Sequence, residues 1–155
     1  MIDAQIDTDG QGPVVLSRDR CLALLATVPV GRIVYTERAL PAVQLVNFAL
    51  AEDTIVVRTA WGSKLAAAAR KAIVAFEADS FDAEARTGWS VTAVGHAHVV
   101  EEPDESALLN SLPLEPWAPG RRQYYVRIAI EMLTGRQIVS AHDGDRPDDR
   151  AERPR

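Results

Sequence analysis

The residues best suited to chemistry lie at one corner of the chain, where the apolar stretch IVV at residues 55–57 gives way to the alanine-rich segment SKLAAAARK. Around this corner stand Arg58, Thr59, Ser63 and Lys64. The β-branched stretch predicts a strand, and the alanines predict a helix that starts at Ser63. A helix N-terminus exposes unpaired N–H groups and carries a partial positive charge, so it attracts anions. With the Ser63 hydroxyl and the Lys64 cation added, the corner would suit a phosphate monoester.

A plainer interpretation of the same residues stays open. Ser63 can be a simple N-cap, and Lys64 can be a solvated residue of the first helical turn. The corner also differs from the standard nucleotide loops. Gly62 lacks the earlier glycine of the Walker pattern, and no G-x-G-x-x-G follows a strand.

Other titratable residues offer weaker candidates. His96 and His98 are two apart on an expected strand and share one face, so they could bind a metal or haem, or simply face solvent. We expect no metal site, because the sequence supplies no third ligand at a suitable spacing. Cys21 lies in an apolar helical stripe, which is typical of a buried structural thiol. No clear catalytic constellation emerges, and the catalytic residues stay unknown.

Mostly strands must position these residues. We expect strands over 30–36, 42–50, 53–59, 72–79, 89–102, 123–133 and 135–141. Short helices are expected after Ser17, at Ser63 and after Pro103. The short connections favour antiparallel hairpins. The predicted fold is therefore mainly β, a small antiparallel barrel with a few short α-helices.

Composition narrows the function classes. The chain has 155 residues, 47% of them hydrophobic, and a net charge of −5. We expect a flexible arm over 1–13, one domain over 14–142 and a disordered charged tail over 143–155. The acidic balance argues against nucleic acid, and no apolar run is long enough for a membrane helix. A single cysteine and a start unlike an export signal predict a cytoplasmic protein.

The order of the motifs resembles one known family. The unit AVQLVNFALAEDTIVVRTAWGSKLAAAARK resembles the flavin mononucleotide (FMN) corner of the pyridoxamine 5′-phosphate oxidase-like split barrels, and GWSVTAVGHAHVV resembles the flavin-lining strand that follows. The resemblance covers roughly residues 17–140 and is nearest to the branch that is similar to nitroimidazole-reducing proteins. It implies a split β-barrel, bound FMN and two-electron redox chemistry on a small molecule.

The resemblance also implies a role for individual residues. The strand from Val43 to Phe48 would offer its backbone to the edge of the flavin ring. Arg58 and Thr59 would touch the ribityl-phosphate end, and Ser63 and Lys64 would bind the phosphate. The implied cofactor-binding residues are Val43, Leu45, Val46, Asn47, Phe48, Arg58, Thr59, Ser63, Lys64, Trp89, Ser90 and Val91. Two subunits build each flavin site in this family, so a homodimer is implied, with the cofactor at the subunit interface.

Departures from the family pattern limit the substrate. Leu65 stands where the oxidase proper has a second basic residue, and Ser90 stands where it has glutamine. The C-terminal W…R run of true oxidases is missing near GRQIVSA. These differences argue against pyridoxamine phosphate as the substrate. Two alternatives stay open on the same fold, namely a deazaflavin-dependent reductase and a non-catalytic module that binds flavin or haem.

Overall fold

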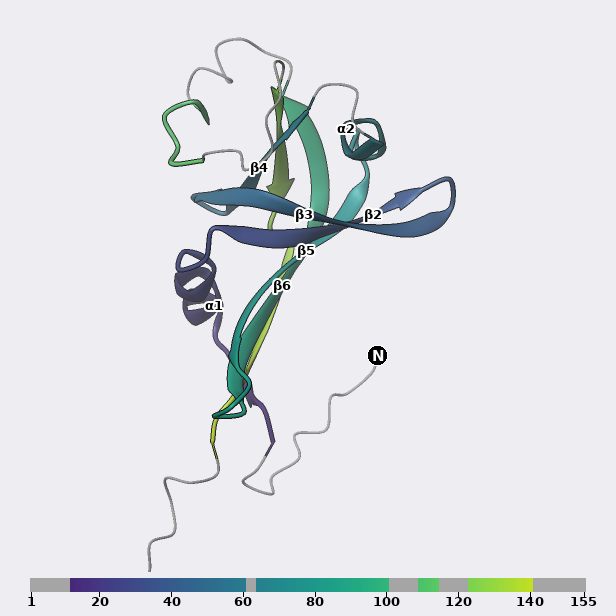
Figure 1. The fold of residues 1–155 in the computed structure, drawn as a ribbon. Coiled ribbons are helices and arrows are strands. Elements are labelled where there is room, and N and C mark those ends of the chain that lie inside the picture. The colour runs from purple at the N-terminus through teal and green to yellow at the C-terminus, as the bar shows by residue number, and fades with distance from the viewer. Residues whose placement is uncertain (1–11, 61–63, 101–108, 115–122, 141–155) are drawn as a thin grey trace, which may run out of the picture.

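The computed structural model describes residues 12–60, 64–100, 109–114 and 123–140. The elements in chain order are β1 (Val14–Val15), α1 (Arg18–Leu25), β2 (Val30–Glu37), β3 (Leu40–Ala51), β4 (Thr54–Ala60), α2 (Lys64–Ala68), β5 (Ile73–Asp82), β6 (Thr87–Val100), β7 (Gln123–Ala129) and β8 (Met132–Ile138). All strand pairings are antiparallel. The described chain is mainly β, as the sequence predicts, and its strands curve into the split barrel of Figure 1.

One long strand closes the barrel. The strands follow one another in the order β1-β8-β6-β5-β2-β3-β4-β7, and β6 also pairs with β7 at the other end of that series. The first half of β6 pairs with β8 over Gly88–Val94, and its end pairs with β7 over Ala97–Val100. Because β6 changes partner along its length, the sheet closes at one end and spreads open at the other (Figure 1).

Strand β4 shows why an unbroken apolar run forms a strand here. Ile55, Val56 and Val57 are all fully buried although their side chains alternate between the two faces. Ile55 and Val57 point into the main core, which is built around Phe76, and Val56 lies in a second cluster on the other face. The second cluster comprises Val56, Val100, Leu109, Leu114 and Tyr125. Burial on both faces removes the polar alternation of a half-exposed strand.

Helix α1 begins and packs as the sequence predicts. The Ser17 hydroxyl accepts a hydrogen bond from the Arg20 N–H at 3.3 Å and caps the helix. Cys21, Leu24 and Leu25 are buried against the barrel. Burial raises the pKa of the Cys21 thiol, which keeps it protonated and agrees with a structural role.

Three boundaries differ from the sequence predictions. The loop predicted over residues 80–88 is shorter, because β5 runs to Asp82 and β6 starts at Thr87. The Asp82 carboxylate accepts the N–H groups of Glu84 and Ala85, both at 2.9 Å, and so stabilises a tight turn. The strand predicted over 123–133 is instead divided, with β7 ending at Ala129 and β8 starting at Met132.

A short strand, β1, also forms where no strand was predicted, paired with β8. The predicted tail over 143–155 and nearly all of the predicted arm lie outside the described residues, as does most of the helix predicted after Pro103.

Candidate functional site

Strands β3 and β4 separate to form a fork. β3 pairs with β2 from Leu40 to Asn47, but it pairs with β4 only from Phe48 to Ala51. The edge of β3 that faces away from β2 therefore has no strand partner over 40–46 within the described part of the chain. Backbone N–H and C=O groups on such an edge need partners, so this edge can accept a ligand that carries complementary donors and acceptors.

The predicted residues of β3 divide between its two faces. Val46 and Phe48 are buried in the main core, where the Phe48 ring lies 4.6 Å from the Phe76 ring between centroids. Val43 and Leu45 are more than half exposed on the outer face, and Asn47 is half-buried. Side chains on the outer face can meet a ligand, whereas Val46 and Phe48 can contribute only their backbone.

Arg58 and Thr59 also lie on opposite faces. Thr59 is buried on the core side of β4, and Arg58 stands on the outer face, with its guanidinium carbon 5.6 Å from the centre of the Tyr125 ring. The Tyr125 hydroxyl donates to Asn110 Oδ1 at 2.6 Å, which holds the ring in place. The Arg58 Nε is buried and has no hydrogen-bond partner among the described residues. A buried guanidinium nitrogen of this kind is suited to a polar or anionic ligand group.

The predicted phosphate corner is only partly described. β4 ends at Ala60 and α2 begins at Lys64, so a strand and a helix flank the corner as expected. Leu65 and Ala69 are fully buried and fix this segment against the core. Ser63 lies outside the described residues, and so does the side chain of Lys64.

The third predicted group lies far from the fork. Trp89 is half-buried, Ser90 is exposed and Val91 is fully buried in the core. Val100 pairs with Tyr125, which pairs with Arg58, so the end of β6 lies beside the fork. At the usual rise of an extended chain, about 36 Å of strand separates Trp89 from Val100. One copy of the chain therefore does not bring Trp89 and Arg58 together on one flavin ring and ribityl chain.

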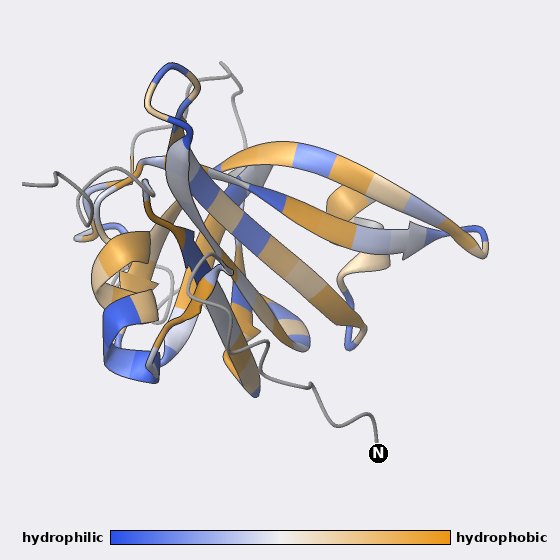
Figure 2. Ribbon diagram, turned by 90° about the horizontal axis from the view of Figure 1, so that it is seen from below, coloured by the Kyte–Doolittle hydropathy of each residue, from blue (hydrophilic) through white to orange (hydrophobic). Residues whose placement is uncertain are grey.

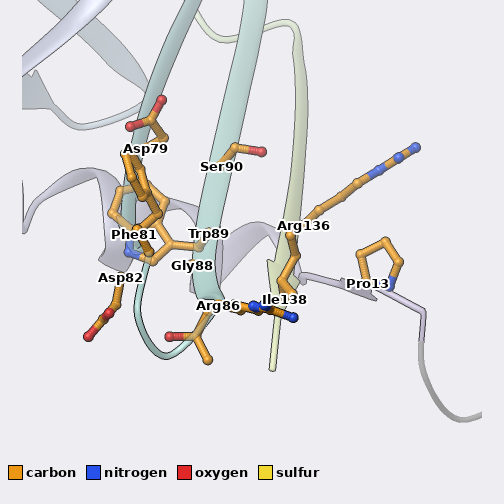
Figure 3. A pocket seen from close by; sticks show the side chains of 12 residues that line it. Pro13, Asp79, Phe81, Asp82, Arg86, Gly88, Trp89, Ser90, Arg136 and Ile138 are labelled. Atoms are coloured by element: carbon orange, nitrogen blue, oxygen red, sulfur yellow. The ribbon is translucent and has the colours of Figure 1, made fainter. Parts of the chain in front are cut away.

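Trp89 and Ser90 instead line an open pocket of about 560 Å³ at the far end of β6. Figure 3 shows them with Asp79 and Phe81 of β5 on one side and Arg136 and Ile138 of β8 on the other. The volume falls in the range of small-molecule sites. Its aromatic walls and mixed charges can hold a flat organic molecule.

A charged cluster lies on the outer face of the sheet, between the β3–β4 fork and the Trp89 pocket. Arg32 on β2 contacts Glu77 at 3.1 Å and Asp79 at 3.0 Å. Burial raises the pKa of the Glu77 carboxyl, the neighbouring Asp79 raises it further, and Arg32 opposes the shift. The cluster therefore places two carboxylates around one guanidinium beside the Trp89 pocket.

Comparison with known proteins identifies the family. The family described as pyridoxamine 5′-phosphate oxidase matches residues 17–137. The chain belongs to this family. An uncharacterised protein of Mycobacterium tuberculosis, Rv0080, is 39% identical over 132 residues, which cover 82% of this chain and 86% of that protein.

Solved structures agree with the family assignment. The FAD binding protein from Mycobacterium smegmatis is 34% identical, with a TM-score of 0.69 over 81% of this chain and 97% of its own. An FAD-binding protein from Mesorhizobium loti, 20% identical with a TM-score of 0.66, covers 81% of this chain and 97% of its own and shares the fold. Among the described residues, no helix is long and apolar enough to span a membrane.

Proposed function

We propose that this protein binds a flavin nucleotide at the β3–β4 fork, through the FMN portion that FMN and FAD share. The observation that carries the proposal is the edge of β3 over 40–46 beside the buried Arg58 Nε, neither of which has a hydrogen-bonding partner among the described residues. The FAD binding protein from M. smegmatis, 34% identical, supports it.

The residues around the fork fit such a cofactor. The edge of the ring system carries donors and acceptors, which the backbone of residues 43–46 would match. Arg58 would meet the polar end, and Ser63 and Lys64 would hold the phosphate. Bound there, the flavin supplies hydride transfer, and the protein supplies position and electrostatics. We infer that the protein is an oxidoreductase that acts on a small organic molecule.

We also propose that the working unit is a homodimer in which Trp89 and Ser90 of a second copy complete the site. The distance along β6 between Trp89 and the fork supports this arrangement, because within one copy the two groups of residues are too far apart to contact the same flavin. The second copy would also bring the pocket beside Trp89 to the flavin, where a substrate could bind.

The outer face of the sheet carries a surface suited to that dimer. Hydrophobic residues are matched in register across five strands and form what we term the apolar row: Val43, Val34, Ala75, Val94 and Met132. Val43 and Met132 are each 63% exposed, and the three between them are half-buried. Figure 2 shows apolar and hydrophilic residues alternating along such strands. A contiguous exposed apolar patch is typical of an interface.

Cofactor titration tests the first proposal. Apoprotein is titrated with FMN, FAD and a deazaflavin, and binding is followed by quenching of the ligand fluorescence. Because the alkyl stem of Met can still pack on Tyr125, Arg58→Met should remove only the charged hydrogen bonds and weaken flavin binding by about 10- to 100-fold. Arg20→Met, on the exposed face of α1, should leave binding unchanged. Failure to bind either flavin, or tighter binding of the deazaflavin, would overturn the assignment.

Subunit mixing tests the shared site. Arg58→Met and Trp89→Ala should each weaken flavin binding alone. In a mixed dimer, the Trp89→Ala copy keeps its fork and the Arg58→Met copy keeps its Trp89, so about one intact site forms per mixed dimer. Mixing the two variants should therefore restore tight binding. If both residues served one chain's own site, mixing would restore nothing.

The apolar row is tested by a charge placed within it. Val94→Lys should convert the dimer to a monomer in sedimentation experiments and weaken flavin binding, because a lysine there must be desolvated at the interface. Ala23→Lys, on the exposed face of α1, should leave the dimer intact. A dimer that survives Val94→Lys would place the interface elsewhere.

A further inference from the structure

Two histidines on β6 lie outside both regions described above. His96 and His98 are exposed on the outer face of the strand. They line a pocket of about 230 Å³ together with Thr54, Arg127 and Ala129. Neither the fork nor the Trp89 pocket uses them, so they are available for a separate function.

Glu131 fixes the orientation of one of these imidazoles. Its carboxylate oxygen Oε1 lies 2.6 Å from His96 Nδ1 and also faces the His96 backbone N–H at 3.3 Å. An ionised carboxylate can only accept hydrogen bonds, so Nδ1 must carry the proton. In the neutral ring the lone pair then resides on Nε2. A histidine that binds a metal typically has this arrangement, with a carboxylate holding its other nitrogen.

The spacing of the two imidazoles suits chelation. Residues two apart on one face of a strand are separated by about 6.6 Å. Imidazole nitrogens bind metal ions at about 2.0–2.1 Å, and histidine side chains are long enough to converge across that gap. We propose that His96 and His98 form a two-histidine site for a divalent transition metal ion, with Glu131 as its positioning residue.

The surroundings define which ion fits. Among the described residues, no group of three or more His, Cys, Asp or Glu side chains is placed to hold a metal ion. Water would therefore complete the coordination sphere, and affinity would follow the intrinsic preference of imidazole, with Cu²⁺ ahead of Ni²⁺ and Zn²⁺. Arg127 pairs with His98 across the strands, and its positive charge weakens the site without blocking it.

Metal titration tests the site in the untagged full-length protein. Cu²⁺ buffered with glycine is titrated calorimetrically, and electron paramagnetic resonance reports the nitrogen ligands. His96→Ala and His98→Ala should each weaken Cu²⁺ binding at least tenfold and remove one nitrogen from the spectrum. His142→Ala is the matched control, because His142 is the remaining histidine of the chain, and it should change neither result. Equal binding by the wild type and both strand variants would overturn the proposal.

Two further variants separate positioning and charge from folding. Glu131→Ala should weaken Cu²⁺ binding about tenfold while the spectrum keeps two nitrogens. Glu131→Gln, whose amide oxygen can still accept a hydrogen bond from Nδ1–H, should have an affinity between those of the wild type and Glu131→Ala. Arg127→Gln should strengthen Cu²⁺ binding. The other candidate ligand is an oxyanion such as phosphate, which needs the guanidinium. If phosphate binds the pocket and Arg127→Gln weakens both ligands, the pocket is an anion site and the metal proposal is wrong.

Discussion

Among the glycines in the described part of the chain, Gly95 is the one at which an added methyl group should lower the stability most. Val94 pairs with Met132 and Ala97 pairs with Ile128, so the register along β6 shifts by one residue at this point. The chain turns between β7 and β8 directly against Gly95. A Cβ built there would overlap the carbonyl oxygen of Ala129 and lie 2.9 Å from its carbonyl carbon.

The expected penalty follows from what must move. The colliding atoms belong to the backbone, so no flexible side chain can yield. Overpacking in a rigid core costs about 1–3 kcal/mol, and a backbone collision belongs at the upper end. For a chain of this size, about 3 kcal/mol lowers the Tm by about 6–12 °C. Gly95→Ala should therefore show this loss in thermal and urea unfolding of the apoprotein.

The control is the same chemical change at an exposed position. Gly12→Ala should alter the stability by less than about 0.5 kcal/mol. Glu131 belongs to the same corner and contacts His96, so Gly95→Ala should also disturb the contact between Glu131 and His96. If Gly95→Ala unfolds within about 0.5 kcal/mol of wild type, the close packing of the β7–β8 corner against β6 is not as described.

Three other substitutions test separate features. Burial, and then Asp79, raises the pKa of Glu77, so ionising this carboxyl destabilises the folded state. As the pH rises from about 4 to 7, the free energy of unfolding of the wild type should therefore fall by about 1 kcal/mol or less relative to that of Glu77→Gln, measured in urea. An opposite slope would refute that sign. Ala39 has a φ of 64° in the β2–β3 turn, so Ala39→Gly should raise the unfolding free energy by about 1 kcal/mol. Ser17→Ala should cost about 1 kcal/mol in the same assay through loss of the α1 cap, and an unchanged midpoint would show that the cap contributes little.

The sequence predicts the fold well wherever local patterns decide it. Strands β2 to β6 were all expected, because apolar and β-branched residues recur along them and turn residues or the alanine-rich α2 segment separate them. The division at Ile130 and Glu131 was missed, since QYYVRIAIEML is mostly apolar and contains no Gly, Pro, Asn or Asp to mark a turn. That break follows from long-range contact with Gly95, which no local pattern reveals.

The candidate site was predictable only in part. The β4–α2 corner follows from composition, but the division of residues between faces needs the register. Alternation along β4 could have placed Arg58 and Thr59 on opposite faces. The pairing of His96 with Glu131 could not have been inferred, because His96 lies on β6 and Glu131 lies in the β7–β8 turn, 35 residues further along the chain.

The unpaired edge of β3 has a consequence for how this family diverges. Main-chain N–H and C=O groups are the same whichever side chains stand at residues 43 and 45, so recognition through them tolerates wide drift in sequence. Only proline, which lacks the N–H, deletes a donor outright. Relatives that bind a ligand through this edge can therefore share the ligand although few of the amino acids along the edge are the same.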